Sequence, residues 1–192
     1  MIVNRMLGII VLVFLVQLSV SGFTEIFFFN PSAFNPYMYV TSIFLHGGIT
    51  HLFFNCFALF LFGSILEKRV GKDEFLTIFF ASGIVGGMLY HLTILLGIIP
   101  PTAALGASGA VYGILGFLSV IMPRLVVYMG FVPMRIRHAA VLWVVLEFVG
   151  AFDVGSGVGS AAHLGGLLFG IAYGYYYKRN EENAAFAEYK WD

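Results

Sequence analysis

Charged residues are scarce in this chain of 192 residues, since Asp, Glu, Lys and Arg together make up only 10% of it. Soluble domains carry about 25% charged residues. Here 60% of the residues are hydrophobic and the mean hydropathy is +0.93. This composition excludes a soluble enzyme and a disordered protein. It also lacks the basic patch of a nucleic-acid binder. The single cysteine, Cys56, excludes an internal disulfide. A polytopic helical membrane protein is the class that remains.

Six apolar stretches approach the roughly 20 residues that a membrane-spanning helix requires. They cover residues 6–20, 51–66, 75–96, 108–122, 139–152 and 161–177. Residues 23–45 contain two Pro and two Asn residues, which predicts an interfacial loop, and residues 125–134 are too short to cross. The predicted fold class is therefore all-α, a six-transmembrane-helix bundle that forms one domain over residues 1–192.

The basic residues all lie in the four segments that six spans would leave on one side of the membrane. They are Arg5, Lys68, Arg69, Lys72, Arg124, Arg135, Arg137, Lys178, Arg179 and Lys190. The positive-inside rule then predicts a multi-pass protein of the cell membrane with both termini in the cytoplasm. Residues 1–22 can alternatively be read as a cleaved signal peptide, which would leave the orientation of the other helices unchanged.

Two of the predicted spans, residues 108–122 and 139–152, are short for a membrane helix. At 1.5 Å per residue they reach about 21–23 Å, whereas the hydrocarbon core is about 30 Å thick. Irregular backbone at that depth is tolerated only where it is buried in protein or lines a wet cavity. We therefore expect a water-filled cavity, open to the outer side.

Four polar residues inside the spans are candidates for chemistry, because such residues are costly in a membrane. His51 and Asn55 lie in the first turns of the second span, Ser108 begins the fourth and His163 begins the sixth. In the predicted topology these three spans all run from outside to inside. Their polar residues therefore share one depth near the outer face, and His51 and Asn55 share a helix face.

Glycine spacing predicts which of these helices touch. The sixth span carries Gly166, Gly170 and Gly174, and the fourth carries Gly109, Gly113 and Gly116. Small residues at such intervals let membrane helices approach closely. If the two stripes face each other, the side chains of Ser108 and His163 come within hydrogen-bonding reach.

A serine hydroxyl becomes a nucleophile when a neighbouring base takes its proton, and His163 is the candidate base. Ser108 begins a helix, where free N–H groups and the positive end of the dipole favour an oxyanion. His51 and Asn55 could add donors. No acidic residue opens a helix beside them, so a triad is not predicted, and Tyr112 is the candidate to pack against the imidazole.

Four motifs resemble those of the rhomboid family of intramembrane serine proteases. They are HGGITHLFFN (46–55), ILEKR (65–69), GASGAVYG (106–113) and AHLGGLLFG (162–170). They are similar to the family patterns HxxxN, ExR, GxSG and AHxxGxxxG, in the same order and on the same helices. Where many relatives carry a Trp-Arg pair, this chain has Tyr37 and Met38, which puts the packing of the first outer loop in doubt.

The resemblance implies a serine endopeptidase that cleaves transmembrane segments of other proteins near the outer face, often after a small residue. Ser108 would be the nucleophile and His163 the general base of a dyad, with Tyr112 supporting the ring. Other implied roles are an oxyanion site of His51 and Asn55, an opening of the fourth helix at Gly106, and a structural pair of Glu67 and Arg69. The fifth helix and residues 153–160 would form a gate and cap. This would be the minimal form of the family.

Each candidate also has a plainer interpretation. Ser108 could be a small residue at a helix contact, His163 an interfacial histidine, and His51 with Asn55 a polar pair that pins the second span. His46 reads as structural and His91 as interfacial, while Glu147 lies about one and a half turns from the outer end of the fifth span.

Two other functions compete with proteolysis. One is a non-catalytic rhomboid-like protein that binds membrane clients, although such proteins usually lack the Ser or the His. The other is a metal-dependent protein that uses His46, His51, His91 and His163, but the chain has no HExxH motif. We expect no metal or other cofactor; the expected partners are transmembrane substrates and the lipid bilayer.

Overall fold

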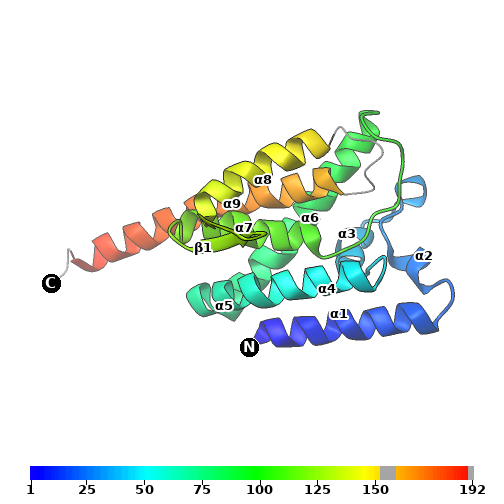
Figure 1. The fold of residues 1–192 in the computed structure, drawn as a ribbon, viewed down its shortest axis with the longest axis horizontal. Helices are drawn as coiled ribbons and strands as arrows, with labels where there is room; N and C mark the ends of the chain where they lie inside the picture. The colour runs from blue at the N-terminus through cyan, green and yellow to red at the C-terminus, as the bar shows by residue number, and fades with distance from the viewer. Residues whose placement is uncertain (152–158, 190–192) are drawn as a thin grey trace.

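The computed structural model describes residues 1–151 and 159–189. Long helices lie side by side in a bundle (Figure 1). They are α1 (Ile2–Ser19), α4 (Ile49–Ala58), which continues through a π-helical turn (Leu59–Gly63) into α5 (Ser64–Val70), α6 (Lys72–Leu95), α7 (Ser108–Ile121), α8 (Ile136–Gly150) and α9 (Ser160–Tyr189). The described residues are thus mostly helical, as the sequence predicts.

Short elements fill the predicted loop between α1 and α4. They are α2 (Phe23–Phe27), α3 (Met38–Thr41) and two 3-10 turns at Pro31–Ala33 and Ser42–Phe44. The Asn30 side chain accepts hydrogen bonds from the backbone N–H groups of Ser32 and Ala33, and so caps the first of these turns. Tyr37 and Met38 are both held in this segment. The Tyr37 hydroxyl donates to the Ile26 carbonyl at 3.0 Å, and Met38 is buried.

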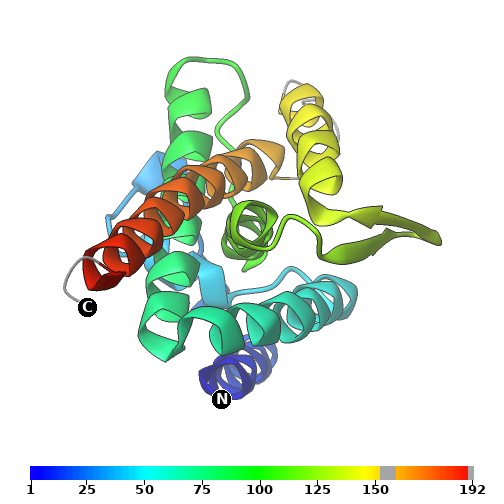
Figure 2. The same cartoon turned by 90° about the vertical axis from the view of Figure 1, so that its left-hand side faces the viewer.

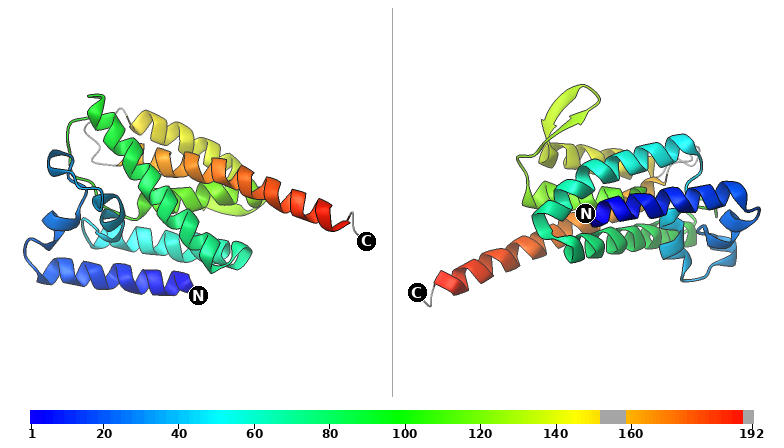
Figure 3. Two further views of the ribbon diagram at one scale, coloured as in Figure 1. Left: turned by 180° about the vertical axis from the view of Figure 1, so that it is seen from behind. Right: turned by 90° about the horizontal axis from the view of Figure 1, so that it is seen from below.

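A β-hairpin departs from the all-α prediction. Strands β1 (Val126–Met129) and β2 (Val132–Arg135) pair antiparallel, with Val127 opposite Met134. The hairpin projects from the side of the bundle (Figure 3). Two consecutive valines favour strand over helix, and Gly130 supplies the positive φ of +63° that the turn needs. The apolar stretch 125–134, too short to cross a membrane, therefore satisfies its backbone by pairing with itself.

Helix α7 occupies the centre of the bundle, as the view along the helices shows (Figure 2). It buries eleven of its 14 residues, a pattern expected of a helix that is apolar on all sides. It ends just before Pro123, which cannot continue a helix. Its length of about 21 Å is well short of a hydrocarbon core of about 30 Å.

Glycines allow α7 and α9 to touch backbone to backbone. A Cβ at Gly166 would clash with the carbonyl oxygen of Gly109, and one at Gly170 with that of Gly113. Gly116 lies in the same way against the carbonyl of Leu167. The two glycine stripes therefore face each other, and this contact fixes the distance between the helices that carry Ser108 and His163.

Three helices of the described residues are long and apolar enough to cross a membrane, namely Ile2–Ser19, Ile49–Val70 and Lys72–Leu95, while Ser108–Ile121 is apolar but shorter. The number of crossings therefore stays a prediction. The basic segments nevertheless gather at one end of the bundle. The N-terminus, the turn between α5 and α6, the hairpin and the C-terminal end of α9 all lie toward the left of Figure 1.

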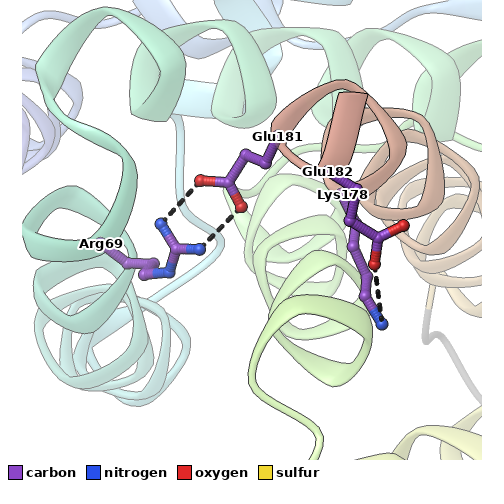
Figure 4. Close-up of polar contacts among 4 residues, drawn as sticks. All are labelled: Arg69, Lys178, Glu181 and Glu182. Atoms are coloured by element: carbon purple, nitrogen blue, oxygen red, sulfur yellow. Dashed lines mark hydrogen bonds and ion pairs between the residues drawn. The ribbon is translucent and has the colours of Figure 1, made fainter. Parts of the chain in front are cut away.

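Glu67 and Arg69 do not pair with each other, which corrects the sequence-based expectation. Glu67 accepts hydrogen bonds from the backbone N–H groups of Ile2 and Val3, at 2.7 and 3.0 Å, at the start of α1. Arg69 forms a two-pronged ion pair with Glu181 on α9, with N···O distances of 3.0 and 2.7 Å (Figure 4). Residues two apart on a helix point in different directions, so each finds its own partner.

The last helix extends beyond its predicted span of 161–177. It continues to Tyr189, past the apolar part of its sequence. Lys178 and Glu182, one helical turn apart, lie 3.9 Å from each other and suit an exposed helical surface (Figure 4). Together with the Arg69–Glu181 pair, they account for a polar continuation of an apolar helix.

Candidate active site

The polar candidates come together at one end of the bundle, where α4, α7 and α9 begin. A cavity of about 640 Å³ lies there, and its lining includes Ser108, Tyr112, His163, His51 and Asn55. These residues come from three helices that are far apart in the sequence. Their shared depth follows from the parallel course of the three helices, which begin toward the right of Figure 1.

Ser108 and His163 are in direct contact. The Oγ atom of Ser108 lies 2.7 Å from Nε2 of His163. Because Ser108 is the first residue of α7 and His163 lies in the first turn of α9, the glycine contact below them holds this distance. A hydroxyl at this distance from an imidazole nitrogen can transfer its proton as it attacks an electrophile.

Tyr112 supports the imidazole from one side. Its ring stacks on that of His163 with a centroid distance of 4.5 Å and an interplanar angle of 8°. Tyr112 stands one turn after Ser108 on α7, which places it beside the serine. Trp143 of α8 in turn contacts the Tyr112 ring edge-on, at a centroid distance of 6.3 Å. The stack restricts rotation of the imidazole out of the plane that faces Ser108.

His51 packs against Gly106 on the other side of the cavity. Its Nδ1 atom accepts a long hydrogen bond of 3.4 Å from the N–H of Gly47. A neutral imidazole that accepts at Nδ1 carries its proton on Nε2, so Nε2 is left as a donor. Gly106 has a φ of +132°, and a Cβ there would come within 2.7 Å of the His51 ring. Only glycine therefore fits between this ring and the start of α7.

Asn55 is buried on the same face of α4. One N–H of its amide donates to the carbonyl of His51 at 2.9 Å, which ties the side chain to its own helix. An amide has a second N–H and a carbonyl oxygen to offer. Ser108 adds its backbone N–H, because the first N–H groups of a helix have no partner within it. The cavity is thus surrounded by donors from two helix starts.

His46 and His91 lie outside the cavity lining. His46 is buried in the loop before α4, where its backbone exchanges hydrogen bonds with the Gln17 amide at 3.0 and 3.3 Å. Burial, and secondarily the nearby His51, lower the pKa of His46 to about 4. His91 instead joins Tyr39, whose hydroxyl lies 2.8 Å from its Nδ1 atom. Of the proposed cap, residues 152–158 lie outside the described part of the chain.

Glu147 of α8 is a neighbour of the dyad; the sequence interpretation noted the residue but did not predict its contact with His163. Its Oε2 atom lies 3.2 Å from Nδ1 of His163, and the two side chains are only 10% and 12% exposed. The carboxylate also interacts with the side chains of Tyr112 and Ser160. A signal was present, since Glu147 stands close to the C-terminal end of a helix that runs opposite to α7 and α9, and so lies level with the starts of those two helices.

Comparisons with known proteins, by family model and by individual relatives, all match rhomboid proteins. The model of the Rhomboid domain matches residues 33–180. The rhomboid-named protein YdcA of Bacillus subtilis is 33% identical over 138 residues, which cover 69% of this chain and 62% of that protein. Rhomboid protein 1, mitochondrial, of Saccharomyces cerevisiae is 32% identical over 160 residues, 74% of this chain and 42% of the relative. Rhomboid protease GluP of Bacillus subtilis is 33% identical over 133 residues, which cover 69% of this chain and 24% of that protein. The chain thus spans less than two thirds of each of these relatives.

Proposed function

Because this chain belongs to the rhomboid family of multi-pass membrane proteins, we propose that it is an intramembrane serine endopeptidase that cleaves transmembrane segments of other proteins. The observation that carries the proposal is the 2.7 Å contact between the Ser108 hydroxyl and the His163 imidazole beside a cavity. Relatives named as proteases support the same reaction class.

In the proposed reaction, Ser108 Oγ attacks the scissile carbonyl carbon while His163 Nε2 takes the hydroxyl proton. The negative charge that develops on the carbonyl oxygen is stabilised by the Ser108 backbone N–H, with Nε2–H of His51 and the Asn55 amide as further donors. The imidazolium of His163 then gives its proton to the leaving amine. Water attacks the resulting acyl-enzyme by the same route in reverse and releases the second fragment.

The substrate is proposed to be a transmembrane segment that unwinds near the outer end of the bundle. Hydrolysis inside a bilayer needs both water and an exposed peptide bond, and the cavity at the start of the short helix α7 offers room for both. Helix α8 is the proposed gate. In its second half Glu147 is the only residue that is buried, so most side chains of this half face away from the rest of the described bundle.

The test is cleavage of a single-span substrate by the purified protein in liposomes. Ser108→Ala and, separately, His163→Ala should each abolish cleavage, and a fluorophosphonate should label the unmodified protein at Ser108. Ser119→Ala is the matched control, because Ser119 lies on the same helix and its hydroxyl only donates to the Gly116 carbonyl at 2.6 Å. Cleavage that survives both substitutions would refute the dyad. Substrate binding without cleavage would favour a client-binding role.

A further inference from the structure

For His163 to act as the base, its Nδ1–H group needs a hydrogen-bond acceptor, and neither Ser108 nor Tyr112 provides one. If Nε2 is to accept the proton of Ser108, it must be unprotonated in the resting enzyme, so the imidazole proton sits on Nδ1. Nδ1 is buried, and among the described residues it has no well-aligned hydrogen-bond partner. A buried N–H without an acceptor is costly. The Nε2–H tautomer, which cannot act as the base, would then compete.

The carboxylate of Glu147 is placed to meet this requirement. Its Oε2 atom is 3.2 Å from Nδ1, on the side of the imidazole opposite to Ser108. The distance suits a hydrogen bond, but the N–H direction is off the line to the oxygen. Active-site hydrogen bonds often align only when substrate is bound. Realignment of the Glu147 carboxylate with Nδ1–H would complete the bond.

The surroundings of Glu147 bury its carboxylate and hold it by contacts with three side chains. An acidic residue inside a membrane protein is costly and needs partners. Glu147 is only 8% exposed and interacts with Tyr112 of α7 and Ser160 of α9 as well as with His163. Tyr112 is the same residue that stacks on the imidazole. One carboxylate therefore contacts both the ring and the group that supports the ring.

We propose that Glu147 is a positioning residue that turns the Ser108–His163 dyad into a Ser–His–Glu triad. Glu147 accepts the Nδ1–H bond, fixes the Nε2-unprotonated tautomer and stabilises the imidazolium that forms when His163 takes the Ser108 proton. That proton passes from Oγ to Nε2 and then to the leaving amine, while Nδ1 keeps its own proton and Glu147 stays ionised. The inference rests on the proposed function and assigns a carboxylate to the same site.

The first experiment compares Glu147→Gln with the unmodified enzyme in the liposome assay. The amide keeps the size of the side chain and removes its charge. We expect kcat to fall by at least about tenfold, within the range of up to about 10⁴-fold that the loss of a triad carboxylate produces. KM should change little, and the rate of Ser108 labelling by a fluorophosphonate should fall with kcat. Glu147→Asp should restore part of both rates. Glu182→Gln, the same change in an exposed ion pair, should alter neither.

The labelling rate separates positioning from gating. A small fluorophosphonate does not need the lateral opening that a transmembrane segment needs. If Glu147 only latches the gate helix α8, Glu147→Gln will leave labelling unchanged and will alter KM or raise cleavage. Unchanged labelling of Ser108 in Glu147→Gln, with either an altered KM or raised cleavage, overturns the inference while the proposed protease function stands. If the unmodified protein neither cleaves nor labels, the proposed function fails and the inference fails with it.

A second measurement reads the tautomer in the unmodified protein and uses a variant only to assign the signals. Nitrogen-15 NMR of histidine-labelled protein distinguishes protonated from unprotonated ring nitrogens, and a His163→Gln sample identifies the His163 signals. The inference requires a protonated Nδ1 and an unprotonated Nε2 at neutral pH in the unmodified protein. A resting enzyme whose His163 carries its proton on Nε2 would refute it.

Discussion

Replacing Gly166 by Ala places a methyl group against the carbonyl oxygen of Gly109, one residue from Ser108. Neither side can yield by rotating a side chain, because both contacting groups are backbone. For normal van der Waals contact, α7 and α9 would have to separate by on the order of 1 Å. Overpacking of this kind costs about 1–3 kcal/mol. A displacement of about 1 Å at a catalytic pair can reduce the rate about 10²-fold.

The assay has two parts, thermal unfolding in detergent and cleavage of a single-span substrate in liposomes. Gly166→Ala should lower both stability and kcat. Gly174→Ala should be milder, because its Cβ would lie 3.0 Å from the Cβ of Val120 and 3.2 Å from the carbonyl oxygen of Phe117, so the helices would have to separate by only a few tenths of an ångström. Gly8→Ala is the control, since it has no atom within 4 Å in the described structure, and alanine should stabilise helix α1 by about 0.5–1 kcal/mol. Full activity and stability in Gly166→Ala would refute the backbone contact as the element that sets the Ser108–His163 distance.

Two further predictions concern charge. Because the pKa of His46 is lowered to about 4 in the folded protein, against about 6.5 when unfolded, protonation favours unfolding. The free energy of unfolding should have its full value above pH 6.5 and fall by up to about 3 kcal/mol as the pH drops toward 4. His46 should cause little further change below pH 4. His46→Gln should remove this part of the pH dependence. Unfolding midpoints at pH 7 and pH 4.5 measure it for the variant and for the unmodified protein. An equal loss of stability between these two pH values in both proteins would contradict the prediction. The Arg69–Glu181 pair, with both side chains 39% exposed, should contribute less than about 1 kcal/mol in a double-mutant cycle, and a larger coupling energy would show that the pair is not surface-like.

Local sequence features were sufficient to predict much of this protein. Apolar length predicted the helices, and the common direction of three spans predicted that Ser108, His163, His51 and Asn55, which lie at their starts, would share one end of the bundle. Glycine spacing predicted the contact of α7 with α9. The glycine contact follows from helical periodicity, which places residues three or four apart on one helix face, and the shared end follows from the alternating direction of successive spans. The number of membrane crossings and the roles of the site residues stay predictions.

Partners between distant elements depended on the tertiary structure. Glu67 and Arg69 look like a pair in sequence, yet one binds the start of α1 and the other a residue of α9. The stretch 125–134 forms a hairpin in which its two halves pair with each other, and its apolar length alone did not reveal that pairing. Glu147 shows the same limit most clearly. Its depth was readable from its position in α8, but whether it pointed at lipid or at Nδ1 of His163 depended on the rotation of α8 about its own axis. That rotation is set by packing against α7 and α9, which no local pattern encodes.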